Sequence, residues 1–348
     1  MNNRYKARES FYIAWNFYLK KDFDNAINYL QVSIDQYPYF VPSHILYLEI
    51  RKNFRQQLQD IDYDNLLLSD DNETFTYIKA LMAQDIKEKL NLFKKSLEKN
   101  PDFFWTLYTL NILEYENPEL QNNISSIIPE KETNSTYYYT KGLVCHNHKN
   151  IQKAIEYYEK SLKLNKRDAN AHFNLAVAYD DSGNEELALK HYEKAINYNP
   201  YFPDAFYNLG CFYFDKKNYQ KAAEYFRKTI ELDEYFPDAY NNLALCYVYQ
   251  QLYDIALEYI EKCILLYPNN IEYNLNYAFI LFQNKKLQKA VNIYKNIIKL
   301  APENQKAHFE LGLTYLKMGQ IKEFKKELKK SMKIKPDTLL FDNIKNIL

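Results

Sequence analysis

The chain repeats one pattern every 34 residues from residue 135 to residue 338. The segment PDAFYNLGCFYF begins at residue 203, and PDAYNNLALCYV follows 34 residues later at residue 237. The consecutive units, which contain no insertion, begin at Ser135, Ala169, Pro203, Pro237, Ile271 and Gln305. A fixed period of about 20–50 residues indicates a repeat array, because each unit buries its apolar face only against its neighbours. The repeat therefore predicts one elongated array rather than several ordinary domains.

Small and large apolar residues occupy fixed positions within each unit. Positions 4, 7, 8 and 11 have the spacing of one helical face, and positions 20, 24 and 27 have the spacing of a second. Small residues at positions 8 and 20 let two helices cross closely, while large residues fill the space around the crossing. Position 8 is occupied by Gly142, Ala176, Gly210, Ala244, Ala278 and Gly312. Position 20 is occupied by Ala154, Ala188, Ala222, Ala256, Ala290 and, as a departure, Phe324.

A proline follows the second helix in four of the units and marks its end. These prolines, at position 32, are Pro200, Pro268, Pro302 and Pro336. Together these residues resemble the tetratricopeptide repeat, whose helix–turn–helix unit is also 34 residues long. The resemblance implies an all-α fold, a right-handed α-solenoid (superhelix), with six regular units over residues 135–338. Residues 339–348 are predicted to form an amphipathic helix that caps the array.

The first part of the chain, residues 1–134, is predicted to contain irregular or degenerate repeats of the same kind. Residues 7–40 form a good unit, and residues 74–101 form a shortened one. Residues 41–73 and 102–128 keep helical periodicity but lack the small-residue signature, which predicts degenerate helical pairs there. Residues 129–136, PEKETNST, are predicted to form a loop, which is either a hinge or a long turn.

The composition favours a cytoplasmic protein without a nucleic-acid partner or membrane insertion. The formal net charge is +0 and the mean hydropathy is −0.57. No apolar stretch reaches the roughly 18 residues of a membrane span, and the N-terminus lacks the features of a secretory signal. The four cysteines form no CxxC pair, as expected of reduced thiols.

The sequence contains no catalytic motif, and we predict no enzymatic activity and no cofactor. Its five glycines lie at position 8 or, as Gly183 and Gly319, in the turn at position 15, so none remains for a phosphate loop. The stretch CHNH, residues 145–148, is the strongest metal candidate. Cys145 falls on a core position and no fourth ligand is near, so no metal site is predicted. His172 and His308, at position 4, are interpreted as packing residues.

A column of asparagines is the strongest candidate for a binding site. Position 6 is occupied by Asn174, Asn208, Asn242 and Asn276 in successive units. A side-chain amide both donates and accepts hydrogen bonds, so such a column can pair with the backbone of an extended peptide. The column is similar to the asparagine ladder of the repeat superhelices of O-linked N-acetylglucosamine transferase and kinesin light chains. The alternative is that asparagine at position 6 only follows the family consensus.

Acidic and aromatic residues are predicted to line the same groove. They are Asp181, Asp204, Tyr207, Asp215, Asp238, Tyr249, Glu272 and Phe282. Such a surface suits a basic or Ser/Thr-rich segment with apolar anchors. Acidic residues in the first turn also stabilise a helix through its dipole, which is the alternative explanation for three of them. The acidic second positions disfavour the clamp that holds acidic chaperone C-termini in other tetratricopeptide proteins.

The leading functional hypothesis is a non-enzymatic scaffold that binds an extended segment of another protein in its concave groove. One alternative is a self-assembling or complex-assembly subunit that uses its convex or N-terminal surfaces. Another is a targeting subunit for a separate enzyme, such as a glycosyltransferase. The sequence leaves the identity of the partner and the oligomeric state open.

Overall fold

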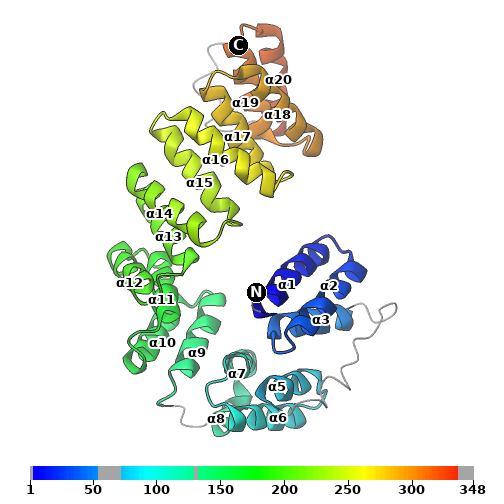
Figure 1. Ribbon diagram of the computed structural model, residues 1–348, viewed down its shortest axis with the longest axis vertical. Coiled ribbons are helices and arrows are strands. Elements are labelled where there is room, and N and C mark those ends of the chain that lie inside the picture. Colours follow the sequence, from blue (N-terminus) through cyan, green and yellow to red (C-terminus); the bar gives the residue numbers. More distant parts are fainter. Residues whose placement is uncertain (1–2, 54–71, 129–131, 336–348) are drawn as a thin grey trace. The chain divides into compact units, whose positions relative to one another are not determined.

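The computed structural model describes residues 3–53, 72–128 and 132–335, and all regular elements among them are helices (Figure 1). The chain divides into two compact units, Met1–Asn184 and Glu185–Leu348, which are described separately. The proposed boundary between irregular and regular repeats, at residues 134 and 135, therefore lies inside the first unit. The predicted capping helix, and residues 129–131 of the predicted loop, lie outside the described residues.

The helices of the first unit include three antiparallel pairs, formed by α1 with α2, α5 with α6, and α9 with α10. In chain order the elements are α1 (Asn3–Leu19), α2 (Phe23–Gln36), α3 (Val41–Asn53), α5 (Glu73–Met82), α6 (Ile86–Lys99), α7 (Phe104–Glu116), the 3₁₀ helix η1 (Pro118–Leu120), α8 (Gln121–Ile127), α9 (Ser135–Asn147), α10 (Ile151–Leu164) and α11 (Ala169–Asp181).

The second unit begins with α12 and then contains four helix pairs, and the second helix of each of the first three pairs also packs against the first helix of the next pair. Its elements are α12 (Glu185–Tyr198), α13 (Pro203–Asp215), α14 (Tyr219–Leu232), α15 (Pro237–Tyr249), α16 (Tyr253–Leu266), α17 (Ile271–Gln283), α18 (Leu287–Leu300), α19 (Gln305–Lys317) and α20 (Ile321–Ile334).

A left-handed residue at position 15 ends the first helix of each of the six regular repeats and of the unit at residues 7–40. In the repeat that begins at Pro203, the backbone amide of Asn218 donates to the carbonyl of Tyr213 over 2.9 Å. This bond satisfies one of the last carbonyls of α13, which have no partner within the helix. Only two of these residues are glycine, so the turn holds the others in a conformation that side chains disfavour. The left-handed residues at this position are Lys21, Lys149, Gly183, Lys217, Gln251, Lys285 and Gly319.

The close helix crossing depends on position 24 as well as on positions 8 and 20. A Cβ atom built on Gly142 would lie 2.5 Å from the ring of Tyr158, and one on Gly210 would lie 2.5 Å from the ring of Phe226. Both aromatic residues occupy position 24 and are fully buried. At these two positions the absence of a Cβ atom lets an aromatic ring lie directly over the backbone.

The last unit solves the crossing differently. Phe324, which replaces the alanine at position 20, is fully buried. A Cβ atom on Gly312 would lie 3.6 Å from Phe324, an ordinary van der Waals distance. The ring of Phe324 therefore lies beside Gly312 without close contact, and the bulky residue at position 20 is accommodated.

A serine in the second helix ties each of four helix pairs to the start of the first helix. Its hydroxyl donates to a backbone carbonyl, as Ser161 does to Ser135 over 2.9 Å. The partners are 26 residues apart in three pairs but 23 apart in the pair Ser96 and Glu73. The same contact is therefore made by α5 and α6 with three fewer residues between the partners. The pairs are Ser33–Ala7, Ser96–Glu73, Ser161–Ser135 and Ser331–Gln305.

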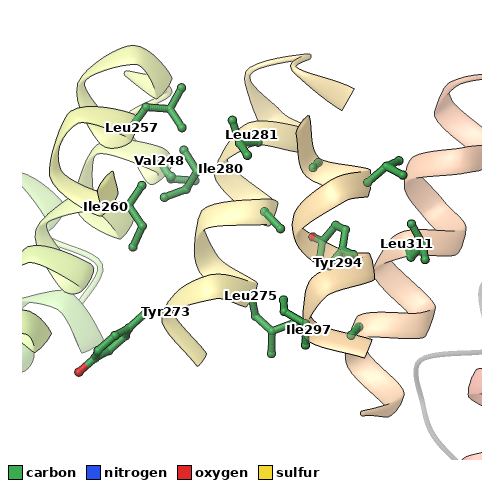
Figure 2. Close-up of a cluster of buried hydrophobic side chains, with 14 of the residues drawn as sticks. Val248, Leu257, Ile260, Tyr273, Leu275, Ile280, Leu281, Tyr294, Ile297 and Leu311 are labelled. Carbon is green, nitrogen blue, oxygen red and sulfur yellow. The ribbon is translucent and has the colours of Figure 1, made fainter. Parts of the chain in front are cut away.

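The core of the second unit is continuous from one repeat to the next (Figure 2). Val248 of α15 and Ile260 of α16 face Ile280 of α17, while Ile297 of α18 packs on the other side of that helix. Each helix pair thus buries its apolar face against its neighbours, which is the source of stability expected of a repeat array.

Candidate functional site

The asparagine column of the second unit lies on the first helices α13, α15 and α17, and its members are half-buried. The side-chain amide of Asn276 donates to Oδ1 of Asn241 over 2.8 Å. Asn241 donates in turn to Oδ1 of Asn242 over 3.0 Å, and Asn242 donates to the hydroxyl of Tyr207 over 3.0 Å. This relay of hydrogen bonds joins three successive first helices, and such chains strengthen one another in a partly buried setting.

The same connection recurs because position 6 of one repeat meets position 5 of the repeat before it, 35 residues away. In the first unit, Asn174 donates to the hydroxyl of Tyr139 over 2.9 Å. Within the second unit, Asn208 donates to the hydroxyl of Tyr192 over 3.2 Å. Each amide nitrogen of the column is therefore used inside the protein.

The side-chain oxygens of the column are less occupied than the nitrogens. Within the described residues, Oδ1 of Asn208 and Oδ1 of Asn276 accept no hydrogen bond, while Oδ1 of Asn242 accepts one from Asn241. An amide oxygen has two lone pairs, so all three retain accepting capacity. The column can accept from a ligand's N–H or O–H groups while its own N–H groups hold the repeats together.

The predicted acidic residues differ in their surroundings. Asp238 accepts a hydrogen bond of 2.6 Å from the hydroxyl of Tyr273, one repeat further on. Burial and this carboxylate together raise the pKa of Tyr273, so the tyrosine remains a neutral donor. Asp204, Asp215 and Glu272 are exposed. Asp204 and Glu272 lie in the first turns of α13 and α17, where the helix dipole also favours them.

The predicted aromatic residues contact partners from neighbouring helices. The ring of Tyr249, which is 56% exposed, stacks on Tyr219 with centroids 4.4 Å apart and planes 10° apart. The ring of Phe282 lies 4.1 Å below the ammonium group of Lys317, a cation–π contact. Sequence reasoning missed Tyr219 and Lys317, although the spacing of 35 residues between Phe282 and Lys317 repeats elsewhere.

The spacing of 35 residues also accounts for the first histidine of the CHNH stretch, whereas the second bonds within its own helix. Nε2 of His146, at position 12, lies 2.8 Å from the carboxylate of Asp181, at position 13 of the next repeat. Nδ1 of His148 lies 2.9 Å from the carbonyl of Val144. Cys145 is buried, and burial raises the pKa of its thiol. Among the residues that the structure describes, no three His, Cys, Asp or Glu side chains are grouped to hold a metal ion.

Cys211 lies beside the asparagine column but is not a nucleophile at neutral pH. Burial raises the pKa of its thiol to about 11. The amide of Asn242 approaches its sulfur at 3.9 Å and also donates to Tyr207. The thiol therefore acts as a small packing group, and the chemistry available at this face is hydrogen bonding, charge attraction and aromatic contact.

Sequence models of the tetratricopeptide repeat match most of the chain. The matches cover residues 10–38, 135–168, 169–202, 203–236, 237–270 and 281–345. The chain belongs to the tetratricopeptide repeat family. The predicted fold class, an all-α solenoid of helix–turn–helix units, is confirmed.

Curated relatives of this tetratricopeptide repeat protein are similar over a short segment. Photosystem I assembly protein Ycf3 from Prochlorococcus marinus, strains NATL1A and NATL2A, is 36% identical over 81 residues. The match covers 22% of this chain and 47% of the relative. The chain thus spans about half the length of the curated relatives it matches.

Solved structures of three proteins share the fold at low sequence identity. Cut9–Hcn1 of the APC/C has a TM-score of 0.52 at 14% identity and covers 97% of this chain and 75% of its own. PilF of Pseudomonas aeruginosa has a TM-score of 0.53 at 20% identity, and the match covers 62% of this chain and 97% of PilF. The C-terminal part of a repeat protein from Cytophaga hutchinsonii has a TM-score of 0.52 at 18% identity, and the match covers 73% of this chain and 98% of that structure.

Tetratricopeptide repeat proteins mediate protein–protein interactions or the assembly of complexes, and their fold is typically a non-enzymatic scaffold. Among the helices of the described residues, none combines the length and hydropathy of a membrane-spanning segment.

Proposed function

We propose that this tetratricopeptide repeat protein is a non-enzymatic scaffold that binds an extended segment of a partner protein along α13, α15 and α17. The observation that carries the proposal is the asparagine column. Its side-chain nitrogens bond within the protein, while Oδ1 of Asn208 and Oδ1 of Asn276 accept no hydrogen bond from the residues that the structure describes. A peptide backbone in extended conformation presents N–H groups that would pair with these oxygens.

The charge of the neighbouring side chains defines the preferred segment. Asp204, Asp215 and Glu272 are exposed on the same first helices. A basic or Ser/Thr-rich segment would complement these carboxylates, and its binding would weaken as salt screens the charges. Tyr249 and Phe282 offer apolar surface for anchoring side chains at the ends of their helices.

The test measures binding of fluorescent peptides by anisotropy, using a library of basic and Ser/Thr-rich sequences. Asn208→Ala with Asn276→Ala removes the two free acceptors and should weaken binding by about 1–3 kcal/mol, since each hydrogen bond contributes about 0.5–1.5 kcal/mol. Asn208→Asp with Asn276→Asp keeps both acceptors but loses the amide donors. We expect this variant to bind basic peptides at least as well as the wild type.

The aspartate variant is the matched control for folding, because both variants lose the hydrogen bonds to Tyr192 and Asn241. Asn197→Ala, at an exposed position of α12, controls for the loss of an asparagine elsewhere. Equal affinity of the wild type and the alanine variant for every peptide that binds would refute the role of the column.

A second candidate function is complex assembly through surfaces other than the asparagine column. The similarity to the assembly protein Ycf3, 36% identity over 81 residues, favours it. Affinity capture with the wild type and the alanine variant separates the two candidates. A partner that is lost only from the variant supports the peptide site, and partners that both forms retain support assembly through another surface.

A further inference from the structure

The asparagine column of the second unit continues into a glutamate. Position 6 of the last repeat is Glu310, on α19. Its side chain is half-buried, as are the asparagines that precede it in the column. Sequence reasoning missed this residue because it departs from the asparagine pattern. A carboxylate carries a full negative charge and only accepts hydrogen bonds, so this end of the column differs in chemistry from the rest.

The geometry of the repeats places Glu310 beside Asn276. A side chain at position 6 reaches position 5 of the repeat before it, as Asn276 does in its bond to Asn241. The corresponding residue for Glu310 is Leu275 of α17, which directly precedes Asn276 and has no donor in its side chain. Glu272 lies one turn before Asn276 and is exposed. Glu272, Asn276 and Glu310 therefore belong to one region of the surface that α17 and α19 form.

The carboxylate of Glu310 has no bonded partner among the residues that the structure describes. It forms neither a hydrogen bond nor an ion pair with them. Burial raises the pKa of this carboxyl above its ordinary value, and the charge of Lys306, one turn earlier on α19, offsets only part of the effect. Burial and the charge of Glu310 raise the pKa of Tyr294 on α18, but the hydroxyl of this tyrosine forms no hydrogen bond in the described part of the chain. Glu310 is thus a half-buried charge without a counter-ion bonded to it.

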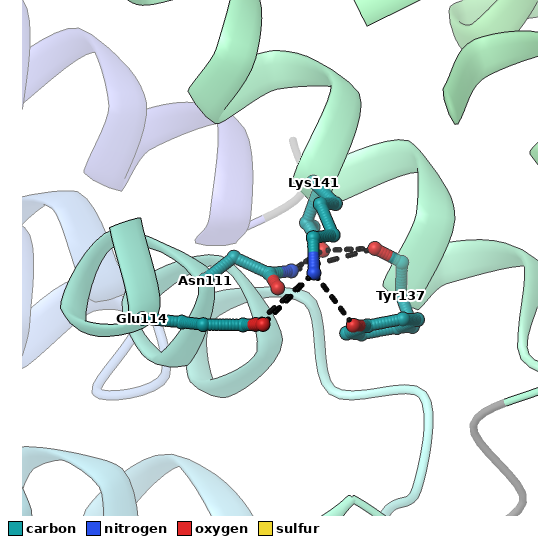
Figure 3. A network of polar contacts seen from close by, with 5 residues as sticks. Asn111, Glu114, Tyr137 and Lys141 are labelled. Carbon is teal, nitrogen blue, oxygen red and sulfur yellow. Dashed lines mark hydrogen bonds and ion pairs between the residues drawn. The ribbon is translucent and has the colours of Figure 1, made fainter. Parts of the chain in front are cut away.

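Two other carboxylates with little exposure are paired within the protein. In the first unit, the carboxylate of Glu114 accepts from the ammonium group of Lys141 over 3.0 Å (Figure 3). In the second unit, the carboxylate of Glu327 accepts from the ammonium group of Lys330 over 2.8 Å. Pairing is the usual outcome, because a charge that is removed from water without a partner is costly. The exception at Glu310 points to a counter-ion that comes from another molecule.

We infer that Glu272, Asn276 and Glu310 bind a lysine or arginine side chain of the partner segment. All three offer acceptors, since Oδ1 of Asn276 accepts no hydrogen bond within the described residues and the two carboxylates carry negative charge. An ammonium group has three N–H donors and a guanidinium group has five, so either cation can bond to more than one of these acceptors while it neutralises Glu310. The inference rests on the proposed peptide site and adds the side chain that α17 and α19 select.

The experiment measures binding of fluorescent peptides to the whole chain by anisotropy. The peptides have equal length and blocked termini, and they alternate serine with lysine, with arginine or with glutamine, so each cationic peptide presents its charge in every register. We expect at least one cationic peptide to bind about tenfold or more tightly than the glutamine peptide, because charge-assisted hydrogen bonds are the stronger ones. The tighter of the two shows which cation is preferred. Absence of binding by both cationic peptides, or equal binding of all three peptides, overturns the inference.

Three variants assign the binding to this region. Glu310→Gln keeps the shape of the side chain but removes its charge, and it should weaken the tighter cationic peptide by about tenfold. The matched control is Glu323→Gln, which removes an exposed carboxylate from the first turn of α20 and should bind within about twofold of the wild type. Lys306→Gln removes a cation that competes with the ligand for Glu310 and should strengthen binding. Equal weakening by Glu310→Gln and Glu323→Gln, or weakening by Lys306→Gln, refutes the inference.

A variant at the other end of the column separates this inference from the proposed function. Asn208, on α13, lies three repeats before Glu310 and does not belong to the cation site. Loss of affinity with Asn208→Ala but not with Glu310→Gln would leave the peptide site standing and refute the inference. Loss of affinity with Glu310→Gln but not with Asn208→Ala would support the cation site and count against binding along the whole column.

Discussion

Replacing Gly210 by alanine tests the reasoning about the helix crossing most directly. The added Cβ atom would lie 2.5 Å from Cε1 and 2.6 Å from Cδ1 of Phe226. The ring is fully buried and its centroid lies 5.6 Å from that of Tyr207, so it cannot turn away freely. Either the ring or the two helices α13 and α14 must shift to admit the methyl group.

The effect of Gly210→Ala on the free energy of unfolding is the difference between two opposing contributions. Overpacking a well-packed core costs about 1–3 kcal/mol. Removing a glycine from a helix interior gains about 0.5–1 kcal/mol. Other repeats combine alanine at position 8 with an aromatic residue at position 24, as in Ala278 and Tyr294, so a wider crossing is attainable. We therefore expect Gly210→Ala to destabilise the protein by about 1 kcal/mol.

Gly312→Ala is the matched control, because its Cβ atom would meet Phe324 at an ordinary 3.6 Å. It should stabilise the protein by about 0.5–1 kcal/mol through helix propensity alone. Native-state hydrogen exchange of α13–α14 and α19–α20 measures both effects locally, which suits a repeat array. In addition, Phe226→Leu should relieve part of the cost of Gly210→Ala in a double-mutant cycle. Equal stabilisation by both alanines would falsify the close contact at Gly210.

Four further changes should alter stability in defined ways, measured by urea denaturation. Lys217→Gly places glycine at a left-handed position and should stabilise by about 0.5–1 kcal/mol; any loss of stability contradicts this. Phe324→Ala should cost about 3–5 kcal/mol by opening a cavity, and a cost below 1 kcal/mol would show that the ring is not packed. Burial lowers the pKa of His44 from 6.5 to about 4, so the unfolded chain takes up a proton before the folded protein does as the pH falls. The free energy of unfolding should therefore drop by about 3 kcal/mol between these two pH values. His44→Gln should remove this drop, and an unchanged pH profile of the variant would contradict the role of His44. Burial opposes ionisation of Glu327, but hydrogen bonds from Lys330 and His308 outweigh it and lower the pKa of the carboxyl below 4.5. Its stabilising effect is thus present above about pH 4.5 and is lost as the pH falls through the folded pKa, and Glu327→Gln should flatten that acid limb.

Much of the fold followed from the sequence because each repeat is a local structure. The helix pairs, the small residue at position 8 and the buried alanine at position 20 all lie within 34 residues of one another. Their spacing is repeated several times, so chance periodicity is averaged out. The role of position 24 could not be predicted from the sequence, because the residue types alone do not indicate that an aromatic ring lies directly over a glycine.

The asparagine column was recognisable, but the use of its atoms was not. Position 6 identifies Asn242 as a candidate, whereas its donation to Tyr207 depends on the residue that the previous repeat presents. Asn208 shows this dependence, because its amide donates to the hydroxyl of Tyr192 on α12 rather than to a side chain at position 5. The peptide site itself stays a prediction that the binding experiments above will test.

The sequence by itself determined the repeat, its period and its family, because these depend on residue types at regular spacing along the chain. The tertiary structure alone decided which polar atoms are satisfied and which remain open. Whether Oδ1 of Asn111 or of Asn276 has a donor depends on side chains far away in sequence. Hydrophobic period is a property of one segment, whereas hydrogen-bond satisfaction is a property of the packed assembly.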